Sequence, residues 1–173
     1  MGDHIKNIAW KASRILRFIQ RVFRDCPDQV RETAYTTLVR PILEYSASVW
    51  NPHQVVFSQE LEKVQRRAAR FVRGNFDPMC SVSNMIASLG WDSLAVRRDT
   101  LSMNFFMKIV QGKTISDVSL TVKNTGSTRL RHNKHLVEMR ARTDSFFWSF
   151  YPRVIRGWNA LPKVVISEMD TIL

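Results

Sequence analysis

The chain has 173 residues, of which 45% are hydrophobic, with only six glycines and six prolines. This composition is typical of a packed globular protein and excludes disordered and fibrous chains, and the length is too short for a complete polymerase. The formal net charge of +11 indicates an anionic partner, which can be nucleic acid, an acidic protein or an anionic membrane surface.

Two cysteines, Cys26 and Cys80, are too few for a disulfide framework or for a zinc site made of four cysteines. No apolar run approaches the roughly 20 residues that a bilayer span needs. The basic N-terminus also has no apolar signal segment followed by a small-residue cleavage site. We therefore expect an intracellular protein, nuclear or cytoplasmic, that is not secreted and has no transmembrane segment.

The N-terminal segment is predicted to form an amphipathic helix that ends at Cys26-Pro27-Asp28. Its apolar stripe follows the spacing i, i+3, i+4: Ile5, Ile8, Ala9, Ala12, Ile15, Leu16, Ile19 and Phe23. At about 100° per residue, a set of positive side chains falls on the opposite side: Lys6, Arg14, Arg17, Arg21 and Arg24.

Residues 28–50 carry a second helical pattern, with Asp28 as the expected N-cap. Pro41 lies inside this pattern. Because proline removes a backbone donor and clashes with the preceding turn, we expect either a kink near Arg40 or two consecutive helices.

Residues 58–74 predict a third amphipathic helix, with Ser58 as its N-cap and Gly74 as its C-terminal glycine. The apolar stripe of this helix consists of Leu61, Val64, Ala68, Phe71 and Val72. Five positive side chains lie within roughly 60° of the direction opposite that stripe: Lys63, Arg66, Arg67, Arg70 and Arg73.

Two shorter patterns predict further helices before residue 112. Ser81 is expected to cap the first, which closes at Gly90, and Asp92 or Ser93 starts the second. Together these segments predict a mainly all-α fold, a helical bundle of about five to six helices, with residues 1–112 as one helical domain.

The helical period is lost between residues 113 and 143, where Asn124-Thr125-Gly126 predicts a turn. We expect an irregular linker or a small strand pair there. Residues 144–173 are expected to form a helical extension that packs on the first domain. Its aromatic residues are predicted to be core rather than ligand contacts: Phe146, Phe147, Trp148, Phe150, Tyr151 and Trp158.

No residue pattern in the chain predicts catalysis. Two-metal nucleotidyl transfer needs carboxylates that hold two ions about 4 Å apart, and no Asp-Asp pair occurs. His132 and His135 have a metal-like spacing, but the flanking Arg131 and Lys134 repel a cation and no third ligand is evident. The dispersed glycines form no phosphate-binding loop. We assign no catalytic residue, no metal site and no cofactor to this chain.

The two basic helix faces allow two interpretations: a hydrated surface that keeps the protein soluble, or a surface that follows the phosphates of nucleic acid. A merely soluble surface usually mixes both signs of charge, whereas these faces carry almost no acidic residues. We favour phosphate contacts by Lys63, Arg66, Arg67, Arg70 and Arg73, with a second row of Arg14, Arg17, Arg21 and Arg24.

Four motifs in one order resemble the C-terminal part of non-LTR retrotransposon reverse transcriptases, above all jockey- and CR1-like LINE elements. They are "VRETAYTTLVRPILEYSASVWNPH" (30–53), "LEKVQRRAARFVRG" (61–74), "SLGWDSLAVRRDTLSMNFFMKIVQG" (88–112) and "SFFWSFYPRVIRGWNALP" (145–162). The similarity covers roughly residues 3 to 162. No single motif is diagnostic, and their order carries the resemblance.

The resemblance implies the thumb of an RNA-directed DNA polymerase and the extension after the thumb, which hold an RNA or DNA template-primer duplex. The fingers and palm, with the paired aspartates that bind Mg²⁺, would lie upstream of Met1 and would be this chain's missing partner. The chain itself is therefore expected to bind nucleic acid without being an enzyme.

Two alternatives stay open at this point. The basic amphipathic helices can instead form a protein- or membrane-interaction module that binds an acidic protein or anionic lipid. The chain can also be a truncated element without function, whose thumb core is incomplete where it once packed against a palm.

Overall fold

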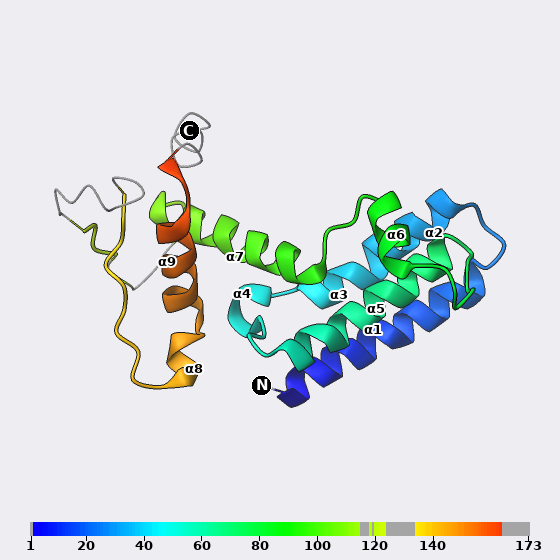
Figure 1. Cartoon of the computed structure of the whole chain (residues 1–173), viewed down its shortest axis with the longest axis horizontal. Coiled ribbons are helices and arrows are strands. Elements are labelled where there is room, and N and C mark those ends of the chain that lie inside the picture. The colour runs from blue at the N-terminus through cyan, green and yellow to red at the C-terminus, as the bar shows by residue number, and fades with distance from the viewer. Residues whose placement is uncertain (1, 115–117, 119, 124–133, 164–173) are drawn as a thin grey trace. The chain divides into compact units, whose positions relative to one another are not determined.

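The computed structural model describes residues 2–114, 118, 120–123 and 134–163 (Figure 1). The described residues form an all-α fold without strands, which confirms the predicted class, and six of their helices have seven residues or more. The elements are α1 (Gly2–Val22), α2 (Asp28–Ala34), the π-helix η1 (Tyr35–Val39), α3 (Arg40–Glu44), α4 (Ala47–Trp50), α5 (Val55–Val72), α6 (Val82–Ser88), α7 (Leu94–Val110), α8 (Asp144–Phe147) and α9 (Phe150–Ala160).

The chain divides into two compact units, Met1–Asp99 and Thr100–Leu173. The division falls inside α7, whereas the sequence suggested a first domain that extends to residue 112. Leu94, at the start of α7, belongs to the core of the first unit, and Phe106 belongs to the core of the second. A continuous helix gives no sequence signal for a division within it.

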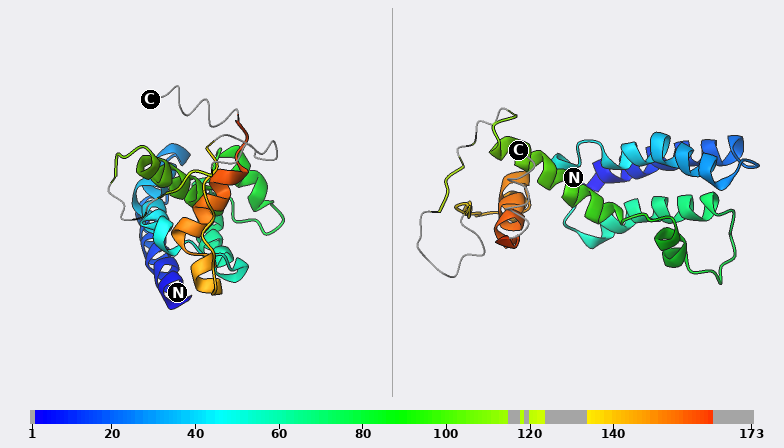
Figure 2. Two further views of the ribbon diagram at one scale, coloured as in Figure 1. Left: turned by 90° about the vertical axis from the view of Figure 1, so that its left-hand side faces the viewer. Right: turned by 90° about the horizontal axis from the view of Figure 1, so that it is seen from above.

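Helices α1 and α5 lie side by side and run in the same direction through the first unit (Figures 1 and 2). Their N-terminal ends meet where Gly2 lies against the ring of Phe57: a Cβ atom on Gly2 would come within 2.6 Å of the Phe57 Cζ atom. Only glycine allows this close approach without a shift of the ring.

The core of the first unit is built mainly from the predicted apolar stripes. Leu61, Val64, Ala68, Phe71 and Val72 of α5 are all buried, as predicted. On α1 the buried side chains are Ile5, Ala12, Leu16 and Ile19. Ile15 was predicted to join them but is 36% exposed, because it lies at the edge of the stripe, about 100° from Leu16.

The second segment is more broken than predicted. Instead of one kinked helix or two consecutive helices, residues 28–50 form α2, η1, α3 and α4. The π-helix η1 directly precedes Arg40 and Pro41, where the missing backbone donor of proline disturbs the regular hydrogen-bond ladder. Ser46, with a φ angle of 53°, then interrupts the helical conformation between α3 and α4.

Two predicted N-caps are wrong. Asp28 is the first residue of α2, where its carboxylate accepts a hydrogen bond from Arg31 at 2.8 Å, and Pro27 takes the cap position. Ser58 lies inside α5, which already begins at Val55, and its hydroxyl accepts a hydrogen bond from Arg98. The helix starts one turn early because no breaker separates residues 55–58 from the stripe.

Other helix ends are confirmed. The Ser81 hydroxyl accepts a hydrogen bond from the Asn84 backbone at the start of α6, and Ser93 does the same for Val96 at the start of α7. Gly74, which follows the C-cap of α5, has a φ angle of 61°, in the left-handed region where a side chain would be strained.

The second unit has its own small core of Phe106, Leu136, Val154, Ile155 and Trp158. The Asn159 side chain donates to the Leu136 carbonyl at 3.0 Å and accepts from the Leu136 amide at 2.9 Å, which fixes the connecting segment against α9. In place of the suggested strand pair, the described residues contain one antiparallel bridge, Val122 with Leu136. The predicted turn at 124–126 lies outside the described residues.

The prediction that the C-terminal aromatics are core holds only in part. Trp158 is buried and donates from its indole nitrogen to the Lys134 carbonyl at 2.8 Å. Phe146 and Phe147 of α8 are 44% and 37% exposed. The short helix α8 buries none of its residues. The aromatic residues of this segment are therefore not all part of the core.

Candidate functional site

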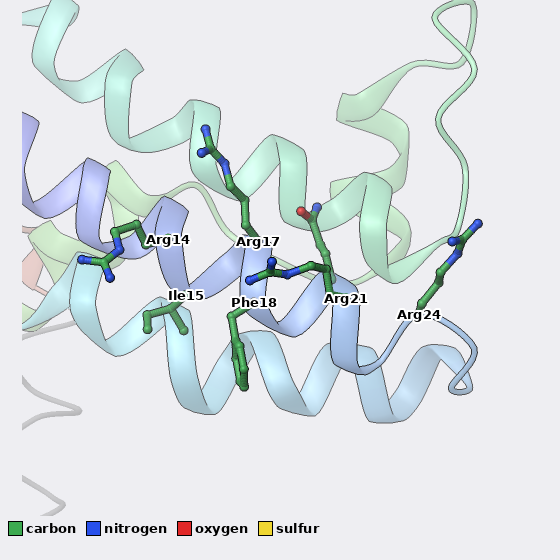
Figure 3. Close-up of a pocket in the computed structure, with 7 residues that line it drawn as sticks. Arg14, Ile15, Arg17, Phe18, Arg21 and Arg24 are labelled. Atoms are coloured by element: carbon green, nitrogen blue, oxygen red, sulfur yellow. The ribbon is translucent and has the colours of Figure 1, made fainter.

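The α1 arginines form the first row of the candidate site. Arg14, Arg17, Arg21 and Arg24 are all exposed. Helical geometry keeps Arg14, Arg17 and Arg21 within a sector of about 60° and spreads them over about 10 Å along α1. Arg24 lies in the turn that follows, because α1 ends at Val22, earlier than the predicted end at Cys26. Together with Ile15 and Phe18 they line an open surface hollow of about 860 Å³, and their guanidinium groups fan out along it (Figure 3). The structure thus brings this predicted row together.

The α5 row begins with three exposed basic side chains in different environments. Lys63 pairs with Glu60 one turn earlier, at 2.5 Å between Nζ and Oε1. Arg67 donates from Nη2 to the Ser13 hydroxyl of α1 at 3.0 Å. Arg66 has no hydrogen bond or ion pair with any part of the chain that the structure describes.

The contact between Arg67 and Ser13 joins the two rows into one surface. Because α1 and α5 run in parallel, one turn beyond this contact Arg17 on α1 comes level with Arg70 on α5. Figure 3 shows the Arg17 side chain extending toward α5. We call the nine predicted basic residues that lie on α1 and α5 or directly after them the basic face: Arg14, Arg17, Arg21, Arg24, Lys63, Arg66, Arg67, Arg70 and Arg73.

The last two residues of the α5 row are directed toward the protein itself. Arg70 donates to the Asp77 carbonyl at 2.8 Å. Arg73 donates to the Ser88 carbonyl and hydroxyl at 2.8 and 2.9 Å, and its Nη1 lies 3.7 Å from the Asp28 carboxylate. Arg73 therefore stabilises the end of the bundle and is the member of the basic face least available to a ligand.

Three glutamates of the first unit make hydrogen bonds away from the basic face and therefore do not neutralise it. Glu32 accepts a hydrogen bond from the Trp91 indole at 2.8 Å. Glu62 accepts from the Ala95 amide at 3.0 Å, at the positive start of α7. Glu44 pairs with Arg97 through both carboxylate oxygens, and this hydrogen bonding raises the pKa of the Arg97 guanidinium above its usual value.

Two exposed aromatic side chains lie among the arginines of α1, and the sequence alone gave neither of them a role. Trp10 and Phe18 are 56% and 51% exposed. The Arg14 Cζ atom lies 4.8 Å from the centre of the Trp10 ring, in a cation–π contact. The signal was present in the sequence, because Trp10, Arg14 and Phe18 follow the i, i+4, i+8 spacing on the side opposite the apolar stripe.

Among the described residues, no group of three or more histidine, cysteine or acidic side chains is placed to hold a metal ion. His132 lies outside them. Within the same part of the chain, no helix combines the length and the apolar character that crossing a bilayer requires.

No family model matches the chain, and neither the curated proteins nor the solved structures contain a significant match to it. The similarity to non-LTR retrotransposon reverse transcriptases therefore stays an expectation that rests on the order of its sequence motifs.

Proposed function

We propose that this chain binds nucleic acid without sequence specificity, by holding the sugar-phosphate backbone of a template-primer duplex against the basic face. The observation that carries the proposal is a set of exposed arginines without a partner among the described residues: Arg17, Arg21, Arg24 and Arg66. Guanidinium groups match phosphate oxygens in geometry and stay charged, and phosphate contacts position a duplex without reading its sequence.

The arrangement of the two helices supports this proposal. A pair of parallel helices linked by Arg67 and Ser13 presents positive charge over about 15 Å, which is long enough to meet several phosphates of one strand. Three glutamates, Glu32, Glu44 and Glu62, are engaged by hydrogen bonds elsewhere in the fold and do not compete for the arginines.

The sequence motifs support a more specific form of the proposal, in which the chain is the thumb-like C-terminal part of a non-LTR reverse transcriptase. In that form, polymerisation with Mg²⁺ belongs to a palm upstream of Met1, and this chain binds the duplex without catalysing the reaction.

A second candidate is binding to an anionic membrane or an acidic protein, and the exposed Trp10 and Phe18 beside arginines favour it. Aromatic and basic side chains together are also found on helices that lie in the membrane interface.

A competition experiment separates the two candidates. The full chain is bound to a fluorescently labelled RNA–DNA heteroduplex, and unlabelled heteroduplex or phosphatidylserine vesicles are then added at equal phosphate concentration. The proposal predicts that heteroduplex displaces the label at least about tenfold more effectively than the vesicles. Displacement by vesicles at lower phosphate concentration than by heteroduplex, or no binding of heteroduplex, would contradict it.

A further inference from the structure

The outer side of α1 combines two kinds of side chain that a duplex-binding surface does not need together. Trp10 and Phe18 expose about half of their surface, although large aromatic side chains are usually buried. Taking Arg14 as the reference, Trp10 lies about 40° to one side of it around the helix and Phe18 about 40° to the other. The rings and the arginines therefore share one sector.

We infer that this sector of α1 is a subsite for unpaired nucleotides, in which Trp10 and Phe18 stack on bases while Arg14, Arg17 and Arg21 contact the phosphates between them. The inference rests on the proposed function and adds the class of nucleic acid: single-stranded segments rather than duplex alone.

The first reason is the chemistry of the ligand. Single-strand binders combine a positive groove with aromatic side chains, because every base has a flat apolar face and every linkage has a charge. In a duplex the bases stack on one another, so surface rings gain little from it without displacing a base. The exposed rings of α1 can therefore stack on the bases of an unpaired strand while the neighbouring arginines contact its phosphates.

The second reason is the order of the side chains along the helix. Trp10 and Phe18 are eight residues apart, about 12 Å along the axis, and Arg14 lies midway between them. Figure 3 shows the guanidinium group of Arg21 between the side chains of Arg17 and Phe18. Arg14 and Arg17 thus lie between the two rings along the helix, as phosphates lie between bases.

The same order argues against a lipid surface. A helix that lies in a membrane interface buries one apolar face and keeps its charges on the other. The continuous apolar face of α1 is already used, since Ile5, Ala12 and Ile19 are fully buried in the core. Inserting Trp10 and Phe18 into the acyl boundary would draw Arg14 in with them.

A second copy of this chain is also a poor occupant, because its own basic face would bring like charges together. Charge complementarity requires a polyanion, and the rings require flat apolar groups on that polyanion. Nucleic acid with unpaired bases has both.

The test compares three probes of equal length: a single-stranded oligothymidylate, an abasic deoxyribose-phosphate oligomer and a DNA duplex. For the full chain, Trp10→Ala and Phe18→Ala should each weaken oligothymidylate binding by about 5-fold to 150-fold, the range that stacking on one base supplies. Binding of the abasic oligomer and of the duplex should change by less than about twofold. Trp10→Phe should retain most of the affinity, because it keeps a stacking face.

Tyr45→Ala is the matched control, since Tyr45 is 79% exposed and lies outside α1. It should leave all three affinities unchanged, and circular dichroism should show native helicity in every variant. If Trp10→Ala and Phe18→Ala bind oligothymidylate like the wild type while the duplex is still bound, the subsite is refuted and the proposed function stands. If the wild type binds none of the three probes, the proposed function fails and the subsite fails with it.

Discussion

Duplex affinity at about 50 mM salt should fall on the order of 10³- to 10⁴-fold when glutamine replaces four arginines of the basic face, Arg17, Arg21, Arg24 and Arg66. These side chains are exposed and have no partner among the described residues, so their replacement should remove the proposed phosphate contacts without breaking contacts that hold the fold. Each contact releases counterions from the nucleic acid, which is why the loss is largest at low salt. Fluorescence anisotropy with a labelled duplex gives the measurement.

The matched control for this variant removes the same charge from the second unit. Glutamine replaces four basic residues that are exposed there, Lys108, Lys113, Lys123 and Arg140. If binding depends on the basic face, this control should lose less than about tenfold, a loss that net charge alone can explain. Equal losses in the two variants would show that the protein binds through its overall charge and that the face has no special role.

Replacement of Leu61 by alanine should lower the free energy of unfolding by about 2–5 kcal/mol. Leu61 is fully buried on the side of α5 opposite the arginines, in one core with Leu16 and Val64. The truncation removes apolar contacts and leaves a cavity that the neighbouring helices can only partly fill. Chemical denaturation followed by circular dichroism measures the change.

Val56→Ala on the same helix is the control for this prediction, because Val56 is 66% exposed and its loss should change stability by less than about 0.5 kcal/mol. At a temperature where Leu61→Ala is still folded, its duplex affinity should equal that of the wild type. If Leu61→Ala leaves the free energy of unfolding unchanged, the core side of α5 was assigned incorrectly. If the folded variant binds duplex more weakly than the wild type, the binding side was assigned incorrectly.

The helices that pack in the first unit could be predicted because their signals are local. The spacing of Leu61, Val64 and Ala68 determines which side of α5 faces the core, and Gly74 has the backbone conformation expected after a helix end. The π-helix η1 could not be predicted, since it depends on how the backbone accommodates Pro41. The contact of Ser58 with Arg98 could not be predicted either, because it depends on tertiary packing.

The residues of the candidate site could be predicted from their spacing, but their individual environments could not. Periodicity places Arg66 and Arg73 on the same helix face, yet Arg73 is held by Ser88 and Asp28, which are distant in sequence. The contact between Arg67 and Ser13 is likewise a product of tertiary packing.

Trp10 and Phe18 were overlooked for a different reason. Their spacing places both side chains off the apolar stripe of α1, but spacing alone does not show which neighbours an aromatic ring has. Their exposure became informative only when the structure placed them beside Arg14 and Arg21.

The salt dependence of duplex binding by the wild-type chain tests the role of the basic face most directly. If about five phosphates are neutralised, a plot of log K against log salt concentration should be linear with a slope near −4.5. A slope close to zero would contradict phosphate binding by α1 and α5, whatever the affinity at a single salt concentration.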